Sequence, residues 1–412
     1  MTAAVDAGPT EQARRARVAV AALFLTNGAL FSNVVPRYPE IKEALDLSNT
    51  LFGTAVAAGP LGALTGGLFA SAAIRRFRSS RTGAIGIALI AAAFLLVAAV
   101  PNWWLLALVL LVAGGADAIV DVAQNAHGLR VQRLYGRSIV NSFHGLWSVG
   151  AVLGGLMGSA AAGLRVSLGV HLAVAGAVFS AVALIAYRFM LPGAEDAERA
   201  APTETGPVPA RRSFTWPAVR MLAALGALAA FGALVEDAGA SWGALFLTDY
   251  LSAGAATAGL AFVALQVAMT VGRLLGDRVV DRFGQRTVTR AGGALAAAGM
   301  GLALTWPSVG TALAGFALAG LGTATLVPAA MHTADELPGL PHGAGLTIVS
   351  WLLRVGFLLS PPLVGLVADL TSLRLGLLSV VVAGVGTLVL GRVLLNRAPD
   401  TKHDLAVPEA AV

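Results

Sequence analysis

The chain alternates between long apolar stretches and short polar ones. A stretch of about 20 apolar residues is long enough to cross the ~30 Å hydrocarbon layer of a membrane as a helix. Twelve such stretches occur, and the breaks between them fall at Pro-containing turns and in Arg-rich clusters. The pattern predicts membrane-spanning helices at about 17–36, 49–73, 82–100, 103–127, 138–163, 166–190, 217–247, 254–276, 287–306, 309–333, 344–368 and 372–395.

The composition excludes a water-soluble protein. Only 12% of the residues are charged and 57% are hydrophobic, with a mean hydropathy of +0.78, whereas soluble domains carry about 25% charged residues. We therefore expect an all-α integral membrane protein. The absence of cysteine excludes disulfides, thiolate nucleophiles and Cys-ligated zinc. No nucleotide-binding or metal-binding motif occurs in a suitable context, so we expect no cofactor, no metal and no ATP-driven transport.

Basic residues are concentrated in alternate connections between the predicted helices. Of the 28 Lys and Arg residues, 23 fall in segments that a cytoplasmic N-terminus would place inside, and four fall in outer segments. The positive-inside rule predicts that both termini are cytoplasmic, and it explains the net charge of +6 without a nucleic-acid partner. Arg354 is the exception, because it lies inside a predicted span. The excess of arginine over lysine indicates a GC-rich bacterial genome, so we expect a bacterial plasma (inner) membrane.

The two halves of the chain are similar to each other. A shift of 206 residues, half the length, superposes Gly66 on Gly272, Phe77 on Phe283, Pro101 on Pro307, Gly114 on Gly320 and Gly150 on Gly356. Parallel repeats of this kind are a recurring design of secondary transporters. We predict a cytoplasmic tail at 1–16, a six-helix half at 17–190, a cytoplasmic linker at 191–216, a second six-helix half at 217–395 and a cytoplasmic tail at 396–412.

A charged motif ends the eighth predicted helix. It reads Gly272-Arg-Leu-Leu-Gly276-Asp277-Arg278-Val-Val-Asp281-Arg282-Phe-Gly284-Gln-Arg286, and it resembles the Gly-x-x-x-Asp-Arg-x-Gly-Arg signature of the major facilitator superfamily. The resemblance implies that family's fold of two pseudo-symmetric six-helix halves. It also implies a gating role for Asp277, Asp281, Arg282 and Arg286. Ordinary positive-inside charge is the alternative explanation for the arginines. The first half places Arg75 opposite Asp281 and so lacks that acid.

The fourth predicted helix carries acids at membrane depth. Asp117, Asp121 and Asn125 are spaced four residues apart and therefore share one face of the helix. Each acid costs ~2.5–3.5 kcal/mol at the bilayer centre on insertion scales. We therefore interpret both acids as functional groups that load protons. The alternative is that they form polar pairs that only hold neighbouring helices together.

Two short strings resemble one branch of that superfamily. Asp121-Val-Ala-Gln-Asn125 resembles the Glu-x-Ala-x-Asn segment of fucose permease and its bacterial relatives, and Asn141-Ser-Phe-His144-Gly145 resembles the start of their next helix. The resemblance implies that Asp121 carries the proton beside Asn125 and that His144 lies in the substrate cavity. That branch has a second acid on its first helix, and the corresponding residue here is Ser32. The resemblance alone therefore does not imply proton coupling in this chain.

Further charged residues lie at membrane depth in the second half. Glu236 and Asp237 lie near the middle of the seventh predicted helix, where three nearby glycines predict a broken helix beside a substrate. We expect one of these acids to share the proton in the cavity; the alternative is a helix end in water. Arg354 must face protein or a watery cavity. It is either a substrate anchor or the counter-ion of Glu236, Asp237 or Asp121.

Three tryptophans at membrane depth are candidates for stacking on a solute, and they are Trp147, Trp242 and Trp351. Packing in the core or against lipid is the alternative for each. The string Gly239-Ala-Ser241-Trp-Gly243 matches the Gly-x-Ser-x-Gly elbow of hydrolases. That elbow needs a strand and a His/Asp pair, which the pattern does not supply, so we do not expect an enzyme.

Together these features predict a secondary transporter in the lipid bilayer. We expect it to move a small polar, sugar-like solute by alternating access, coupled to protons, and to act as a monomer. A proton-coupled exporter of drugs or metabolites is one alternative, against which the low aromatic content of 7% argues. A membrane receptor that does not transport is another.

Overall fold

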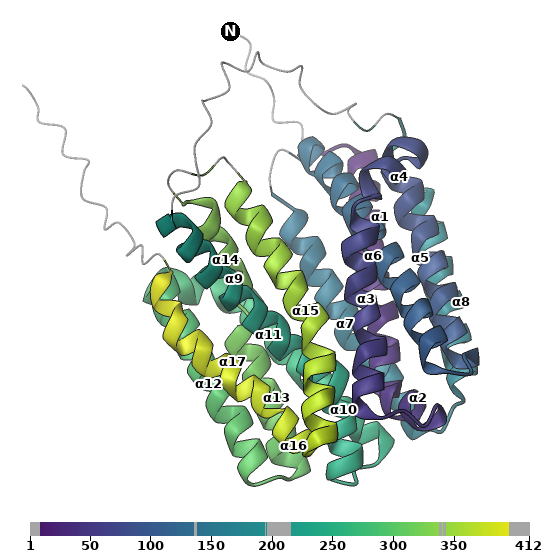
Figure 1. Ribbon diagram of the computed structural model, residues 1–412. Coiled ribbons are helices and arrows are strands. Elements are labelled where there is room, and N and C mark those ends of the chain that lie inside the picture. The colour runs from purple at the N-terminus through teal and green to yellow at the C-terminus, as the bar shows by residue number, and fades with distance from the viewer. Residues whose placement is uncertain are drawn as a thin grey trace, which may run out of the picture.

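The computed structural model describes residues 9–135, 138–193, 195, 216–337, 340 and 343–394. These residues form helices and no strand, as predicted, and Figure 1 shows the two halves of the chain side by side. The N-terminal half contains α1 (Glu11–Val34), η1 (Val35–Arg37), α2 (Tyr38–Ala44), α3 (Asn49–Gly67), α4 (Ala70–Phe77), α5 (Ser79–Leu96), η2 (Val97–Ala99), α6 (Trp103–Tyr135), α7 (Val140–Gly163) and α8 (Leu168–Tyr187).

The C-terminal half repeats this arrangement. It contains α9 (Trp216–Asp237), η3 (Ala238–Trp242), α10 (Gly243–Leu245), η4 (Phe246–Tyr250), α11 (Ala255–Phe283), α12 (Gln285–Thr305), α13 (Val309–Thr323), α14 (Leu326–Asp335), α15 (Ala344–Leu370), α16 (Leu373–Gly376), α17 (Leu378–Leu390) and η5 (Gly391–Val393). The linker at 196–215 and the two tails, at 1–8 and 395–412, lie outside the described residues.

The described helices agree with the predicted spans in order and position. By length and composition, ten of them are apolar enough to cross a membrane, and an eleventh is added if the bent pair of α3 and α4, at 57°, counts as one span. The remaining predicted span coincides with α12, which is 21 residues long but carries Arg286 and Arg290 in its first two turns. Every predicted span therefore coincides with a helix.

Some helices extend beyond the apolar stretch that predicted them. The prediction placed the end of the eighth span at residue 276, but α11 continues to Phe283, so Asp277 and Asp281 are helical rather than part of a loop. α6 likewise continues past residue 127 to Tyr135. Hydropathy detects only the part of a helix that contacts lipid or core, whereas the backbone hydrogen bonds continue into the polar surface.

The seventh helix is not broken at its glycines, contrary to the prediction. The chain is helical from Trp216 to Tyr250, and two π-helical segments, η3 and η4, replace the expected break. A π-helical turn accommodates an extra residue without unwinding the helix, and such turns occur frequently at functional sites. The η3 segment begins directly after Glu236 and Asp237, which are the last two residues of α9.

Glycines allow the helices to pack backbone against backbone, and the repeat places these contacts equivalently in the two halves. A Cβ atom added to Gly114 would lie 2.1 Å from the carbonyl oxygen of Gly59, and one added to Gly320 would lie 2.2 Å from that of Leu265. The shift of 206 residues relates both members of the first contact to those of the second. The sequence repeat therefore corresponds to a repeat of helix contacts, α3 with α6 and α11 with α13.

We expect Gly62→Ala to destabilise the protein by about 1–3 kcal/mol, because overpacking has a cost of this size. A Cβ atom at Gly62 would lie 1.9 Å from the Leu111 carbonyl oxygen, which belongs to the backbone of α6 and cannot rotate away. Gly67 ends the same helix and has no atom within 4 Å of its added Cβ. Thermal unfolding of the purified protein in detergent would measure the effect. Equal stability of Gly62→Ala and the control Gly67→Ala would contradict this account of the packing.

The two halves contact each other at the end of the bundle that contains α2, α10 and α16. There α3 packs against α15, α7 packs against α11, and α2 packs against α10. We call this end the closed face, and we call the other end, where α1 and α9 begin and η5 ends, the terminal face (Figure 1). Lys42 Nζ and Asp249 Oδ2 form an ion pair between the halves at the closed face, at 3.8 Å.

Candidate functional site

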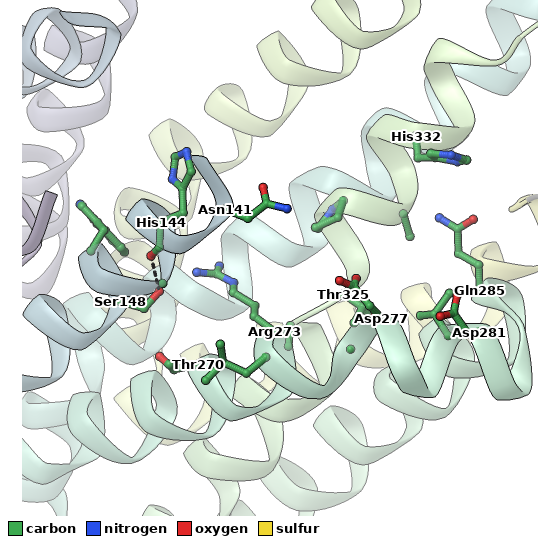
Figure 2. A pocket seen from close by; sticks show the side chains of 18 of the residues that line it. Asn141, His144, Ser148, Thr270, Arg273, Asp277, Asp281, Gln285, Thr325 and His332 are labelled. Carbon is green, nitrogen blue, oxygen red and sulfur yellow. Dashed lines mark hydrogen bonds between the residues drawn. The ribbon is translucent and has the colours of Figure 1, made fainter. Parts of the chain in front are cut away.

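A large cavity lies between the halves toward the terminal face, with a volume of about 1010 Å³. One wall comes from the start of α7, with Asn141, His144 and Ser148, and the other comes mainly from α11 and α14. Figure 2 shows Arg273, Asp277 and Asp281 along α11, across the cavity from His144. We call this space the vestibule.

A smaller cavity of about 380 Å³ lies deeper between the halves. Both halves line it, and its polar lining residues are Asn27, Ser32, Tyr38, Asp117, Trp147, Glu236, Asp237, Ser241, Gln266 and Arg354. Its apolar wall includes Phe31, Phe94, Phe262 and Phe357. We call it the inner cavity. Five residues that were selected from the sequence therefore share one cavity, and they are Asp117, Trp147, Glu236, Asp237 and Arg354.

Asn27 of α1 connects two of the predicted residues. Its side-chain nitrogen donates to Asp117 Oδ1 at 2.7 Å, and its side-chain oxygen accepts from Trp147 Nε1 at 2.8 Å. Three helices, α1, α6 and α7, are joined by these two hydrogen bonds. The bonds hold the Asp117 carboxylate and the Trp147 ring against the inner cavity, and nothing in the local sequence pattern around Asn27 indicated this role.

Asp121 belongs to a second polar chain that leads toward the vestibule. Asn125 Nδ2 donates to Asp121 Oδ1 at 3.0 Å, and His144 Nε2 lies 3.1 Å from Asn125 Oδ1. The Asp121 carboxylate also interacts electrostatically with His144 and with Arg354 of the opposite half. The three residues that the fucose-permease resemblance selected are therefore neighbours in space, across α6 and α7.

The two acids of α9 have different partners. Asp237 is 7% exposed, and its Oδ1 accepts a hydrogen bond from Ser241 in η3 at 2.8 Å. Glu236 pairs instead with Arg273 of α11, with 3.5 Å between Oε2 and Nη2. Because Glu236 lines the inner cavity and Arg273 lines the vestibule, this ion pair lies between the two spaces. Arg273 thus binds an acid at membrane depth, a role that its place among the basic residues near a helix end did not indicate.

Arg354 of α15 has an exposed side chain that lines the inner cavity. Within the part of the chain that the structure describes, no carboxylate lies within ion-pair distance of its guanidinium. Of the two roles considered, an ion pair in direct contact is therefore not formed in this conformation. Asp121 of the opposite half interacts with it electrostatically, without a direct contact. The guanidinium donors remain available to a solute in the inner cavity.

The structure places two of the three tryptophans away from both cavities. Trp242 is fully buried, and its ring packs edge-on against Phe52 with 5.7 Å between the ring centroids. Trp351 is 43% exposed and lines neither the vestibule nor the inner cavity. Only Trp147 lines both spaces. The solute-stacking hypothesis is therefore kept for Trp147 alone, because Trp242 packs in the core and Trp351 lies outside both cavities.

The motif residues on α11 lie at the rim of the vestibule. Asp277 and Asp281 both line it, and neither forms an ion pair with any of the described residues. Arg282 stacks on Phe283, with 5.5 Å between its guanidinium carbon and the ring centroid. Arg286 donates to the Leu394 carbonyl oxygen at 3.0 and 3.1 Å and so joins α12 to the residue that follows η5. In this conformation Arg286 has a structural contact within its own half.

Known proteins are similar to this chain in sequence and in fold. The Major Facilitator Superfamily profile matches residues 20–236 and 227–411. The uncharacterized transporter y4wD of Sinorhizobium fredii is 30% identical over 361 residues, which span 86% of this chain and 92% of its own length. The crystal structure of the nucleoside transporter NupG superposes with a TM-score of 0.69 at 14% identity, covering 93% of this chain and 98% of that one. The D-xylose-proton symporter gives 0.68 at 14% identity, covering 92% and 96%.

The two structural neighbours are below the identity at which function is transferable, so they support the fold alone. The narrower resemblance to the fucose-permease branch stays a prediction. The profile match, in contrast, spans both six-helix halves and includes nearly all of the residues described above. This chain belongs to the major facilitator superfamily.

Proposed function

We propose that the protein moves a small polar, sugar-like solute across the bacterial plasma membrane by alternating access, coupled to protons. The observation that carries this proposal is the inner cavity, to which both halves contribute ionisable residues while they meet at the closed face. Its volume of about 380 Å³ falls within the ~300–1,000 Å³ of sites for small molecules. The D-xylose-proton symporter, by its name, combines a sugar and a proton on the same fold.

The proton is assigned to the acids between the two halves. Asp121 is the main carrier, because it lies at the end of the hydrogen-bonded chain that begins at His144 in the vestibule. Asp117, Glu236 and Asp237 are assigned a share in proton binding, because all three line the inner cavity. An acid in this position gains or loses its charge beside the solute, which is what links the two fluxes.

The solute is assigned to the polar residues of both halves. Arg354 and Trp147 line the inner cavity directly, and Asn125 with His144 continues the polar surface into the vestibule. Trp147 offers an apolar ring face beside the hydrogen-bonding groups, an arrangement suited to a ring that carries hydroxyl groups. A monomer contains the whole site.

The motif on α11 is assigned to the gate at the terminal face. Asp277 and Asp281 line the vestibule, so closing it would bring them toward the start of α7. Arg282 and Arg286 follow them closely in the chain and are assigned to the same gate. The positive-inside rule places this face in the cytoplasm, with both chain termini. The conformation described here is then open to the cytoplasm.

The test is flux into vesicles that contain the purified protein. With an imposed pH gradient, we expect accumulation of a monosaccharide or polyol from a panel that also contains organic cations, organic anions and dyes. Vesicles without protein are the control. Gradient-driven efflux of dyes, with no uptake of hydroxylated solutes, would favour the exporter instead. No flux of any compound under any gradient, from a correctly folded protein, would contradict transport.

A further inference from the structure

The closed face contains a carboxylate of one half that binds the start of a helix in the other half. Asp369 lies near the end of α15, in the C-terminal half. Its Oδ1 accepts from the backbone nitrogen of Asn49 at 3.0 Å and from the side-chain nitrogen of Asn49 at 2.9 Å. Its Oδ2 accepts from the backbone nitrogen of Thr50 at 2.8 Å. All three donors belong to the first two residues of α3.

These donors are the groups that a helix cannot satisfy by itself. The first four backbone N–H groups of a helix have no intrahelical partner, and they carry the positive end of the helix dipole. The side chain of the cap residue of α3, Ser48, accepts from the backbone nitrogen of Leu51 at 3.2 Å. The N–H groups of Asn49 and Thr50 are therefore left for Asp369. Hydrogen bonds to a charged acceptor are about twice as strong as neutral ones.

The surrounding backbone holds Asp369 in this position only while the halves are together. A Cβ atom added to Gly365 would lie 2.4 Å from the Asn49 carbonyl oxygen, and one added to Gly53 would lie 2.3 Å from that of Pro361. The two helices thus touch backbone to backbone along the two turns of α15 that precede Asp369. Separating them by a few ångströms would break all three hydrogen bonds at once.

We propose that Asp369 is the gating residue of the closed face, and that its contact with the first turn of α3 sets the balance between the two access states. This inference rests on the proposed alternating access. The Lys42–Asp249 ion pair also joins the halves at this face, but its 3.8 Å separation makes it the weaker contact. Removing the Asp369 carboxylate should therefore shift the protein toward the state that is open at the closed face and sealed at the vestibule.

Single cysteines would report both faces, because the natural chain contains none. Ser159→Cys probes the closed face, since Ser159 is buried where α7 meets Gly259 of α11. Gly145→Cys probes the vestibule, because Gly145 lines it and an added Cβ meets no atom within 4 Å. The rate of labelling by a water-soluble maleimide is measured for each cysteine in the full-length protein, reconstituted in vesicles made permeable to the reagent.

We expect Asp369→Ala and Asp369→Asn to raise the labelling rate at Ser159→Cys by about tenfold and to lower the rate at Gly145→Cys. Asn49→Ala removes one of the three bonds and should give a smaller shift in the same direction. The matched control is Asp46→Asn, since Asp46 is an exposed acid of the same face with no side-chain hydrogen bond or ion pair to the described residues. It should leave both rates unchanged.

Two other outcomes would overturn the proposal. Unchanged rates at both cysteines in Asp369→Ala would show that the carboxylate does not hold the closed face. Faster labelling at both cysteines would show a general loss of stability rather than a shift between two states. Labelling does not depend on the solute or the proton. The labelling rates can therefore be interpreted even if the vesicles show no flux of the proposed solute, and the flux can be interpreted even if the labelling rates contradict the role of Asp369.

Discussion

Asp121→Asn should abolish solute accumulation driven by a pH gradient while leaving solute exchange across the membrane in place. Asparagine keeps the size of the side chain and an oxygen that can accept from Asn125, whose amide lies 3.0 Å from Asp121 Oδ1. It cannot bind and release a proton, however. The site would still bind solute and change its access, but the downhill movement of protons would no longer drive that cycle.

The size of the expected effect follows from the gradient. One proton that crosses a gradient of one pH unit releases about 1.4 kcal/mol, which sustains at most about a tenfold accumulation of a neutral solute. Asp121→Asn should reduce this ratio to about one. Vesicles loaded with unlabelled solute, with no pH gradient, would measure the exchange that remains. Lost accumulation with intact exchange would indicate loss of the proton site, whereas loss of both would indicate loss of the solute site.

A matched control tests whether the effect is specific to Asp121 rather than common to the loss of any carboxylate. Glu43→Gln removes an exposed carboxylate from the same half, at the closed face, outside both cavities. It should accumulate solute like the natural protein. If Asp121→Asn still accumulated solute to the natural ratio, the proton would have to be carried by Asp117, Glu236 or Asp237, and the assignment of Asp121 would be wrong.

Arg354→Ala should weaken solute transport by about 10- to 100-fold, seen as a higher half-saturation concentration. A hydrogen bond from a charged donor contributes about 1.5–3 kcal/mol, and its loss gives a factor of this size. Arg354 lines the inner cavity, and no carboxylate of the described chain lies within ion-pair distance of it. Its donors are therefore free to serve the solute. Concentration-dependent exchange in vesicles would measure the change.

Two variants test whether Arg354 acts through its donors. Arg354→Lys keeps the charge but replaces the planar guanidinium by a single ammonium, and it should recover only part of the affinity. Arg188→Ala is the control, because Arg188 is exposed at the end of α8, outside both cavities. Natural half-saturation in Arg354→Ala would exclude Arg354 from the solute site.

The sequence indicated some residues of the candidate site but not others. Asp117 and Asp121 stood out because charge is costly at membrane depth, and the structure joins each of them to polar side chains of the N-terminal half. The roles of Asn27 and Arg273 were not visible in the pattern. A single asparagine within a helix and an arginine near a helix end are both common in sequences. Only the contacts of Asn27 with Asp117 and of Arg273 with Glu236 show that these two residues belong to the site.

The sequence by itself determined that the chain is a membrane protein built from helices in a fixed order, in two repeated halves. Hydropathy over about 20 residues identifies the helices, and the 206-residue repeat identifies the two halves. Both signals, like the distribution of arginine, can be found by comparing stretches of the sequence, without knowing which helices are in contact. Tertiary structure alone decided which end of the bundle is closed, which residues share the inner cavity, and that Asp369 binds the start of α3. Those contacts join residues 320 positions apart, and no local pattern determines which helices meet or which of their sides face each other.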